Sequence, residues 1–522
     1  MDLLAELNQG RPERRLVQLL AADLWGIEAR LVEIQASCLG DEANPPRILG
    51  LPDAAVREAY HRVRTAFQAL RLGFPRGQVV VNLAPARSRK AGSSFDLGIA
   101  LALAALAGLL PPARLAGTLC FGELGLDGGL RPVPGTIARV ELACRLRLDA
   151  VLCPQESGGL ARRVAGDRVA VRPARHLEEA LAILGQGAEA ILPPTPPVAA
   201  GAHGRRPAPD LGRVRGQALA RRALFLAAAG GHNLLLSGPP GCGKSLLASC
   251  LPGLLPPLSR PEALEVLRVE NALDEGSEAR AEARLAEGLA PFRAPHHSVS
   301  HAGLVGGGSP PRPGEVSLAH RGVLFLDELP EFRRESLEAL RVPLEQGSIV
   351  LRRATAAFRF PARFQLVAAM NPCPCGLLGH PRLPCRCSEP MVQRYRARIS
   401  TPILDRIDLL LELEPVEAED LLGTAEAEPE SPALRERVDR LRALQRARNG
   451  GLLNALLDER ALRAMLVPRA RRLLVDRCRD GVLSARAIIR VLRLARTVAD
   501  DLGLADIDVE ALSLALSLRH RL

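Results

Sequence analysis

The sequence contains almost no lysine, and it has no apolar run long enough to cross a membrane. Only Lys90 and Lys244 occur among its 69 basic residues, so arginine occupies nearly every other cationic position. The longest apolar run, Leu97–Leu110, is shorter than the ~20 residues that span a bilayer, so we expect a buried helix there. The N-terminal segment lacks the basic-then-apolar layout of a signal peptide. We therefore expect a cytoplasmic protein whose 11 cysteines are reduced thiols or metal ligands.

The positive charge is concentrated near the C-terminus. The net charge is +11, and residues 431–500 alone hold 17 arginines against 7 acidic residues. A basic domain of this kind indicates a polyanionic partner such as nucleic acid. The alternative is a solvated helical surface in an arginine-rich protein.

The length of 522 residues predicts about three domains. Residues 191–210 contain six prolines and little apolar periodicity, which predicts a linker. It separates an N-terminal domain, residues 1–190, from a larger module. That module divides into an α/β core, residues 211–415, and a helical lid, residues 416–522, in which apolar residues recur at helical spacing and no strand pattern occurs.

The N-terminal domain alternates between strand and helix patterns. Leu31–Ile34 and Val79–Leu83 are typical of strands, whereas Ala54–Leu70 and Asp96–Leu110 are typical of helices. Gly122–Gly129 predicts a strand followed by a tight turn, because Asp-Gly and Gly-Gly favour hairpins.

A phosphate-binding loop follows the short apolar strand Asn233–Leu236. It matches the pattern G-x-x-x-x-G-K-[ST], and a helix is expected to start at Lys244. Its glycines let backbone N–H groups face phosphates, while the helix directs its positive dipole end at them. We expect Lys244 to contact the β- and γ-phosphates of ATP and Ser245 to bind Mg²⁺. The predicted ATP-binding residues are Gly238, Pro239, Pro240, Gly241, Cys242, Gly243, Lys244 and Ser245.

Two further buried strands end in polar residues. Val323–Leu326 precedes Asp327 and Glu328, and ligands bind at the carboxyl ends of such parallel strands. We expect Asp327 to hold Mg²⁺ and Glu328 to activate the attacking water. The alternative is an ordinary strand that ends at a polar turn. Phe364–Met370 ends at Asn371, whose amide is placed to position the lytic water.

Four cysteines form two closely spaced pairs. Nine residues separate the pair Cys373 and Cys375 from the pair Cys385 and Cys387. Two thiol pairs on a loop can surround one tetrahedral Zn²⁺, although this spacing is tighter than usual. The alternative is a loop with reduced cysteines.

These features resemble the AAA+ ATPases of magnesium-chelatase type, and more closely the YifB/ComM family. The resemblance covers nearly the whole chain. Its motifs are Val214–Gln217, Ala227–Asn233, Pro291–His297, Leu304–Gly308, Pro313–His320, Leu326–Phe332, Leu404–Asp408 and Leu483–Arg486. It implies a P-loop AAA+ core with a helical lid, assembled as a hexamer with ATP between subunits.

The resemblance also assigns roles to individual residues. It implies that Arg406 acts as an arginine finger on a neighbouring subunit, with Arg398 or Arg396 as substitutes, and that Arg486 senses the nucleotide. An insertion of about residues 260–320 would point toward the ring pore. His296 and His297 lie in it, and adjacent histidines on a strand face opposite ways, so we expect a structural or pore-loop role rather than a metal site.

The N-terminal domain resembles the α+β, S5-like fold of Lon-type proteases as it appears in the YifB/ComM family. The resemblance rests on Gly92–Leu97 and Gly122–Val133, and it puts Ser94 near the position of the nucleophile. Arg131 stands where the resemblance expects the catalytic lysine, and arginine stays protonated and cannot act as a base. We therefore expect no proteolysis.

The leading interpretation is an ATP-hydrolysing hexameric motor on DNA, a helicase for branch migration in recombination or natural transformation, as the resemblance implies. The alternatives are a magnesium-chelatase subunit, against which the fused N-terminal domain argues, an ATP-dependent Lon-like protease, and a nucleotide-gated scaffold.

Overall fold

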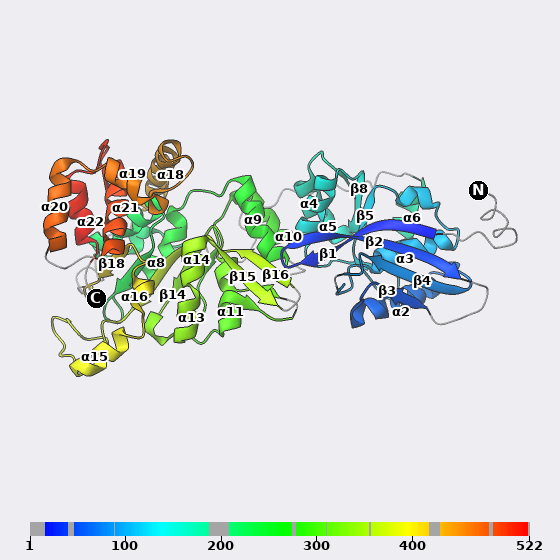
Figure 1. Ribbon diagram of the computed structural model, residues 1–522, viewed down its shortest axis with the longest axis horizontal. Helices are drawn as coiled ribbons and strands as arrows, with labels where there is room; N and C mark the ends of the chain where they lie inside the picture. The colour runs from blue at the N-terminus through cyan, green and yellow to red at the C-terminus, as the bar shows by residue number, and fades with distance from the viewer. Residues whose placement is uncertain are drawn as a thin grey trace. The chain divides into compact units, whose positions relative to one another are not determined.

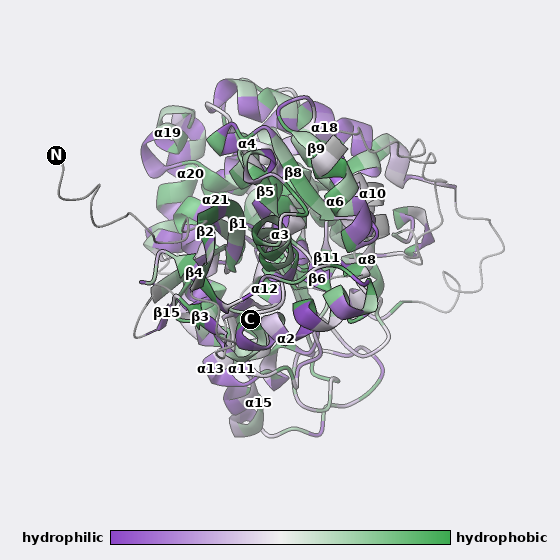
Figure 2. Cartoon of the chain, turned by 90° about the vertical axis from the view of Figure 1, so that its right-hand side faces the viewer, coloured by the Kyte–Doolittle hydropathy of each residue, from purple (hydrophilic) through white to green (hydrophobic). Residues whose placement is uncertain are grey.

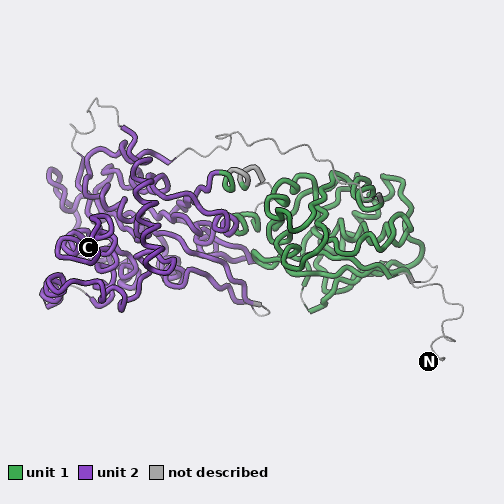
Figure 3. Tube along the Cα trace, turned by 90° about the horizontal axis from the view of Figure 1, so that it is seen from above, with its two compact units in different colours: residues 1–203, 267–286 green, residues 204–266, 287–522 purple. Residues whose placement is uncertain are grey.

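The computed structural model describes residues 16–39, 46–87, 89–186, 208–273, 278–309, 311–353, 356–416, 428–479 and 484–519. The chain forms two compact units (Figure 3). Unit 1 comprises residues 1–203 and 267–286, and unit 2 comprises residues 204–266 and 287–522. Nearly all of the predicted linker, residues 191–210, lies outside the described residues. None of the described helices is both long enough and apolar enough for a bilayer span.

Unit 1 is built on a seven-stranded mixed sheet with the order β3-β4-β2-β1-β5-β8-β9 (Figure 1). Its strands are β1 (Leu16–Trp25), β2 (Glu28–Leu39), β3 (Arg47–Leu49), β4 (Gln78–Ala84), β5 (Thr118–Cys120), β8 (Ala150–Pro154) and β9 (Ala170–Ala174), with a separate hairpin of β6 (Glu123–Leu124) and β7 (Leu130–Arg131). Its helices are α2 (Ala54–Ala69), α3 (Asp96–Leu106), α4 (Thr136–Leu146), α5 (Gln155–Ala165) and α6 (Leu177–Gln186). The predicted strands, helices and tight turn of this region are present, although the helix predicted over Asp96–Leu110 ends at Leu106.

Helix α3 is the predicted apolar helix, and it lies inside the unit. Every residue from Asp96 to Ala105 is buried, and the helix is hydrophobic on all sides (Figure 2). Such a helix has no polar face to turn toward water, so it becomes the core. Burial raises the pKa of Asp96, and Arg62 offsets this with hydrogen bonds of 2.8 and 2.9 Å to the two carboxylate oxygens.

The expected insertion of residues 260–320 is divided between the two units. Helix α9 (Arg260–Asn271) crosses the division, and residues 267–286, which include most of α10 (Glu278–Glu287), belong to unit 1. Asn271 accepts hydrogen bonds from the backbone of Gly135 (2.9 Å) and Ile137 (3.1 Å), and Arg268 pairs with Glu141 at 2.8 Å. These polar contacts attach the segment to α4.

Unit 2 contains a five-stranded parallel sheet with the order β11-β14-β17-β10-β18. Its strands are β10 (Leu234–Ser237), β11 (Phe292–Arg293), β14 (Val323–Leu326), β17 (Gln365–Met370) and β18 (Leu409–Glu412), and the hairpins are β12 (Gly306–Gly307) with β13 (Arg312–Pro313) and β15 (Ser348–Arg353) with β16 (Ala356–Pro361). The helices of this core are α7 (Ala218–Gly230), α8 (Lys244–Leu254), α11 (His301–Val305), α12 (Glu315–Leu318), α13 (Arg334–Ala339), α14 (Arg341–Gln346), α15 (Glu389–Arg396) and α16 (Thr401–Leu404).

Strand β10 shows how the sheet is buried on both faces. Leu234 and Leu236 pack in one hydrophobic cluster, which also contains residues of α7 and α8, whereas Leu235 packs in a second cluster. Alternate side chains of a strand point to opposite faces, so a continuous apolar run of this kind identifies a covered central strand. This confirms the α/β core expected from the sequence.

The C-terminal residues are helical, as predicted. The helices are α18 (Ser431–Arg448), α19 (Glu459–Ala464), α20 (Pro468–Arg479), α21 (Ala485–Asp501) and α22 (Val509–Ser517). Helix α18 binds the end of α7, because Arg442 donates to the carbonyl of Ala228 (2.6 and 2.9 Å) and Gln445 to that of Ala229 (3.2 Å). The last carbonyls of a helix have no partner within the helix, so these side chains satisfy them.

Candidate nucleotide-binding site

The predicted phosphate loop connects β10 to α8, as its sequence requires. Gly243 directly precedes α8 and has a φ of 91°, in the left-handed region that favours glycine. At Gly238 space is the constraint, because a Cβ there would lie 2.8 Å from the carbonyl oxygen of Leu413. The backbone of the loop therefore turns tightly, as the glycines of the phosphate-binding motif predict.

The ammonium group of Lys244 lies within this curve. Its Nζ donates to the carbonyl oxygens of Gly238 (2.6 Å) and Pro239 (2.9 Å). It also lies 3.2 Å from Oδ1 of Asn371, the residue that follows β17. The adjacent parallel strands β10 and β17 thus bring Lys244 and Asn371 together at their carboxyl ends.

Asp327 connects the end of β14 to the first turn of α8. Its Oδ2 accepts a hydrogen bond from the Ser245 hydroxyl at 2.7 Å, and its Oδ1 accepts from the backbone N–H of Glu328 at 2.9 Å. A hydroxyl and a carboxylate are oxygen ligands that suit Mg²⁺, which usually keeps several waters and binds few protein groups. The residues present therefore fit the expected magnesium site.

Glu328 has a partner that the sequence analysis did not predict. Its Oε2 lies 3.2 Å from Nδ1 of His297, and its backbone has a φ of 52°. The ring of His297 also packs edge-on against Phe332, with ring centroids 6.5 Å apart. The spacing of 31 residues between His297 and Glu328 has no periodic signal, so only the tertiary fold reveals this pair.

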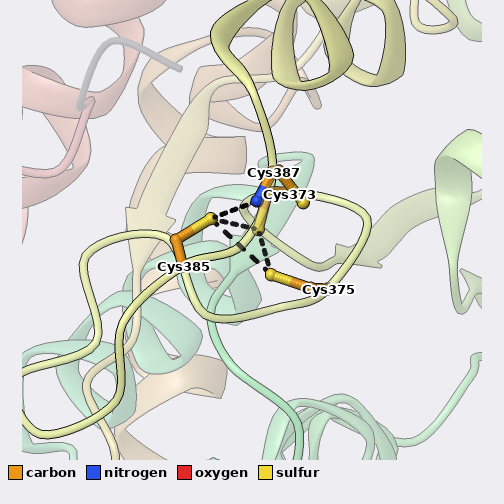
Figure 4. Close-up of side chains that lie close together, drawn as sticks. All are labelled: Cys373, Cys375, Cys385 and Cys387. Carbon is orange, nitrogen blue, oxygen red and sulfur yellow. Dashed lines mark hydrogen bonds between the residues drawn. The ribbon is translucent and has the colours of Figure 1, made fainter.

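The four cysteines converge on a single point (Figure 4). All four sulfur atoms lie within 4.8 Å of one another. Cys373 lies 3.4 Å from Cys375 and 3.7 Å from Cys385, sulfur to sulfur. A tetrahedral zinc with Zn–S bonds of about 2.3 Å requires sulfur separations of roughly 3.8 Å, so the thiols fit this ion. Backbone N–H groups of Arg386 and Leu377 lower the pKa of Cys375 to about 6.

The cysteine loop lies directly against the phosphate loop. A Cβ at Gly376 would be 2.7 Å from Cδ of Pro240 and 3.9 Å from Cγ of Asn371. Gly376 has a φ of 78°, so both its conformation and its surroundings favour glycine. The conformation of the cysteine loop therefore influences the positions of Asn371 and of the phosphate loop, which it contacts.

Arg406 and Arg486 lie together, and the cavity beside them is lined by none of the phosphate-loop residues. The cavity has a volume of about 180 Å³ and is lined by Glu345, Asp405, Arg406, Arg486, Ile489, Arg490 and Arg493. Arg406 pairs with Glu345 at 2.6 Å, and Arg486 lies 3.5 Å from Asp405. Ser484 caps α21 by accepting from Ala487 N–H at 3.2 Å, which puts Arg486 in the first turn.

The two alternative arginines have other partners. Arg398 pairs with Glu331 at 2.8 Å, and Arg396 donates to the carbonyl of Pro372 at 3.3 Å. Arg398 therefore contacts a residue that lies only three positions after Glu328, the predicted catalytic acid. Neither residue lines the cavity that contains Arg406 and Arg486.

Asp408 connects the lid to the sheet. Its side chain is 1% exposed, and it accepts from the backbone N–H of Asn233 at 2.9 Å and pairs with Arg490 of α21 at 3.2 Å. His232 lies 3.7 Å away. Burial alone would raise the pKa of Asp408, but His232, the charge of Arg490 and the Asn233 N–H lower it to about 2. The carboxylate is therefore ionised wherever the protein is folded at ordinary pH.

In unit 1, Ser94 and Arg131 differ in environment. Ser94 is 5% exposed, whereas Arg131 of β7 is exposed. The neighbouring Ser93 hydroxyl donates to Glu123 of β6. Lys90 is fully buried, and its Nζ donates to the carbonyl of Pro85. The likeness of this unit to Lon-type domains stays a prediction.

Comparison with known proteins gives matches along most of the chain. Three family models match: "Magnesium chelatase, subunit ChlI" over residues 210–421, "Subunit ChlI of Mg-chelatase" over residues 34–157, and "Magnesium chelatase, subunit ChlI C-terminal" over residues 428–519. The uncharacterized protein YifB of Salmonella typhimurium is 41% identical over 88% of both chains, and that of Escherichia coli 42% over 87% of both. Competence protein ComM of Haemophilus influenzae is 38% identical over 95% of both chains.

The matched ranges 210–421 and 428–519 include the phosphate loop, the acidic pair and the described lid helices, and the phosphate loop follows strand β10 of the sheet. The chain therefore belongs to the YifB/ComM family of magnesium-chelatase-like AAA+ ATPases.

Proposed function

We propose that this protein is an ATP-driven motor on DNA, a helicase that moves branched junctions during recombination or natural transformation. The observation that carries the ATPase part is the convergence of Lys244 with Asn371 and of Ser245 with Asp327 at one edge of the sheet. The DNA part is supported by the basic lid and by a relative named as a competence protein.

In this proposal each residue of the site has one role. Lys244 binds the β- and γ-phosphates, and Glu328 accepts a proton from the attacking water, which Asn371 orients. Ser245 and Asp327 would hold Mg²⁺, which neutralises charge on the phosphates when bound. Because each of these groups acts only on correctly placed reactants, a displaced water or phosphate would slow hydrolysis strongly.

Arg406 and Arg486 are proposed to act on the ATP of a neighbouring subunit in a hexamer. Support comes from their shared position beside a cavity lined by no residue of their own phosphate loop. An arginine supplied by a neighbour stabilises charge that develops on the γ-phosphoryl group. Hydrolysis would then require assembly, and an isolated subunit would bind ATP but turn it over poorly.

The test is the ATPase rate with and without forked DNA, followed by strand displacement, in the wild type and in Glu328→Gln. We expect DNA to stimulate the wild type and Glu328→Gln to bind ATP without hydrolysing it. A magnesium-chelatase subunit is the second candidate, favoured by the three family-model matches. If DNA does not bind at low salt and does not stimulate the ATPase, the motor is rejected in favour of the magnesium-chelatase subunit. Casein degradation that Ser94→Ala abolishes would instead support the protease.

We also propose that Cys373, Cys375, Cys385 and Cys387 hold one structural Zn²⁺. The sulfur separations support this, and a closed site with four thiolates stabilises a loop without taking part in catalysis. The purified protein should contain one zinc per chain, and Cys385→Ser should lower that content. A cobalt-substituted protein should show the absorption of tetrahedral thiolate coordination. Metal-free protein with four alkylatable thiols in this loop would reject the site.

A further inference from the structure

The arginines of the C-terminal lid fall into two groups that the sequence does not separate. The first group is used inside the protein. On α21, Arg490 pairs with Asp408 at 3.2 Å, and Arg493 donates to the carbonyl of Leu457 at 2.8 Å. Arg496 is fully buried and pairs with Asp500 at 2.7 Å. These side chains hold the lid together and are not available to a partner.

Three of the six arginines of helix α18 also bind groups inside the protein. Arg437 pairs with Asp501 at 2.6 Å, Arg442 binds the end of α7, and Arg448 donates to Asp500 at 2.9 Å. Its exposed arginines are Arg435, Arg440 and Arg446, and they are interspersed with the exposed acids Glu436 and Asp439. The outward face of α18 therefore carries little net charge.

Helix α20 is different, because its arginines face outward. Arg469, Arg471, Arg472, Arg477 and Arg479 are all exposed, against the single exposed acid Asp476. Ala470 and Leu474 are buried, and they attach the opposite side of the helix to the hydrophobic core. Arg479 lies 3.6 Å from Asp476, whereas the other four arginines have no ion-pair partner within the described part of the chain.

We infer that the exposed face of α20 binds the phosphate backbone of nucleic acid, an inference that rests on the proposed function. Arg469, Arg472 and Arg479 are spaced at three and seven residues, so they fall near one line along the helix. That line is about 15 Å long at 1.5 Å per residue. It matches roughly four nucleotides of one strand at about 3.4 Å each.

The chemistry of this face favours backbone contacts over base contacts. A planar guanidinium can bind a phosphate with two hydrogen bonds, and it is weakly hydrated, which suits an exposed contact. The sequence of α20, Pro468–Arg479, contains no aromatic residue on which a base could stack. Binding through α20 is therefore independent of nucleotide sequence.

The test compares two triple variants that remove the same charge from two different lid helices of the full-length protein. The first is Arg469→Gln/Arg472→Gln/Arg479→Gln on α20. The matched control on α18 replaces the three exposed arginines there, as Arg435→Gln/Arg440→Gln/Arg446→Gln. Glutamine has a helix propensity close to that of arginine, so both helices should remain folded, which circular dichroism checks.

Affinity for a fluorescent single strand and for a fork is measured between 50 and 200 mM salt. Each phosphate contact contributes about 0.7–0.9 to the slope of log affinity against log salt. The α20 variant should lose about two units of slope and about tenfold or more in affinity at the lower salt, equally for all sequences. The control should lose much less, and both should keep the wild-type ATPase rate without DNA.

The outcomes separate this inference from the proposed function. If the wild type does not bind DNA at all, the proposed function fails. If the wild type binds and the two variants are equally affected, or the α20 variant binds like the wild type, the assignment to α20 is overturned. Loss of binding that depends on base sequence would also overturn it.

Discussion

Asp408→Asn offers a quantitative test of how the lid is attached to the ATPase core. The substitution keeps the size of the side chain but removes a buried charge. It leaves Arg490 of α21 without its 3.2 Å partner and weakens the contact with the Asn233 N–H, which precedes β10. We expect the variant to unfold more easily and to hydrolyse ATP more slowly, since Arg490 and Arg486 line the same cavity.

The expected loss of stability in Asp408→Asn follows from the pKa of Asp408. Its fall from 3.8 to about 2 corresponds to roughly 2 kcal/mol of stability at neutral pH, at about 1.4 kcal/mol per pKa unit. Because the folded-state pKa is the lower one, this stabilisation is present above about pH 4 and is lost as the pH falls from about 4 to 2. Roughly half of it remains at pH 3. The wild type and Asp408→Asn should therefore converge in acid.

Urea unfolding at pH 7 and at pH 3 measures this difference by far-ultraviolet circular dichroism. The fluorescence of Trp25, the single tryptophan, reports unit 1 separately and should not change. Asp405→Asn is the control, because Asp405 lies 3.5 Å from the exposed Arg486 and should contribute little to stability. A loss well below 1 kcal/mol at pH 7, or a loss that is undiminished at pH 3, would refute the reasoning.

Three further predictions concern the nucleotide site. Lys244→Ala should lower the ATPase rate by about a hundredfold or more, because it removes a positioned charge from the phosphates; a steady-state assay near the wild-type rate would contradict its role. His297→Ala should change the DNA-independent kcat without changing ATP affinity, because it frees Glu328 from its 3.2 Å partner; the matched control is His296→Ala, and equal kinetics of the two would show that the pair has no influence. Mixing Arg406→Ala with Lys244→Ala protein should restore part of the activity if Arg406 serves a neighbour, and no recovery at any ratio would exclude action across subunits.

The sequence by itself determined where the candidate nucleotide site lies and what type of fold carries it. The phosphate loop, its flanking strand and helix, and the acids at 327 and 328 occur where the motif and the apolar runs predict them. These signals are local, since they depend on backbone conformation and on the burial of neighbouring residues. The apolar helix at Asp96 was equally readable, because a helix without a polar face has only one stable location.

The tertiary structure decided the contacts between residues far apart in the chain. It paired His297 with Glu328, gathered four cysteines around one point, and divided the predicted insertion at Leu267. It also separated Arg490, Arg493 and Arg496 of α21, which bind groups inside the protein, from the exposed arginines of α20. No periodicity encodes such differences. They depend on which acid or carbonyl the folded chain brings within hydrogen-bonding distance of each guanidinium.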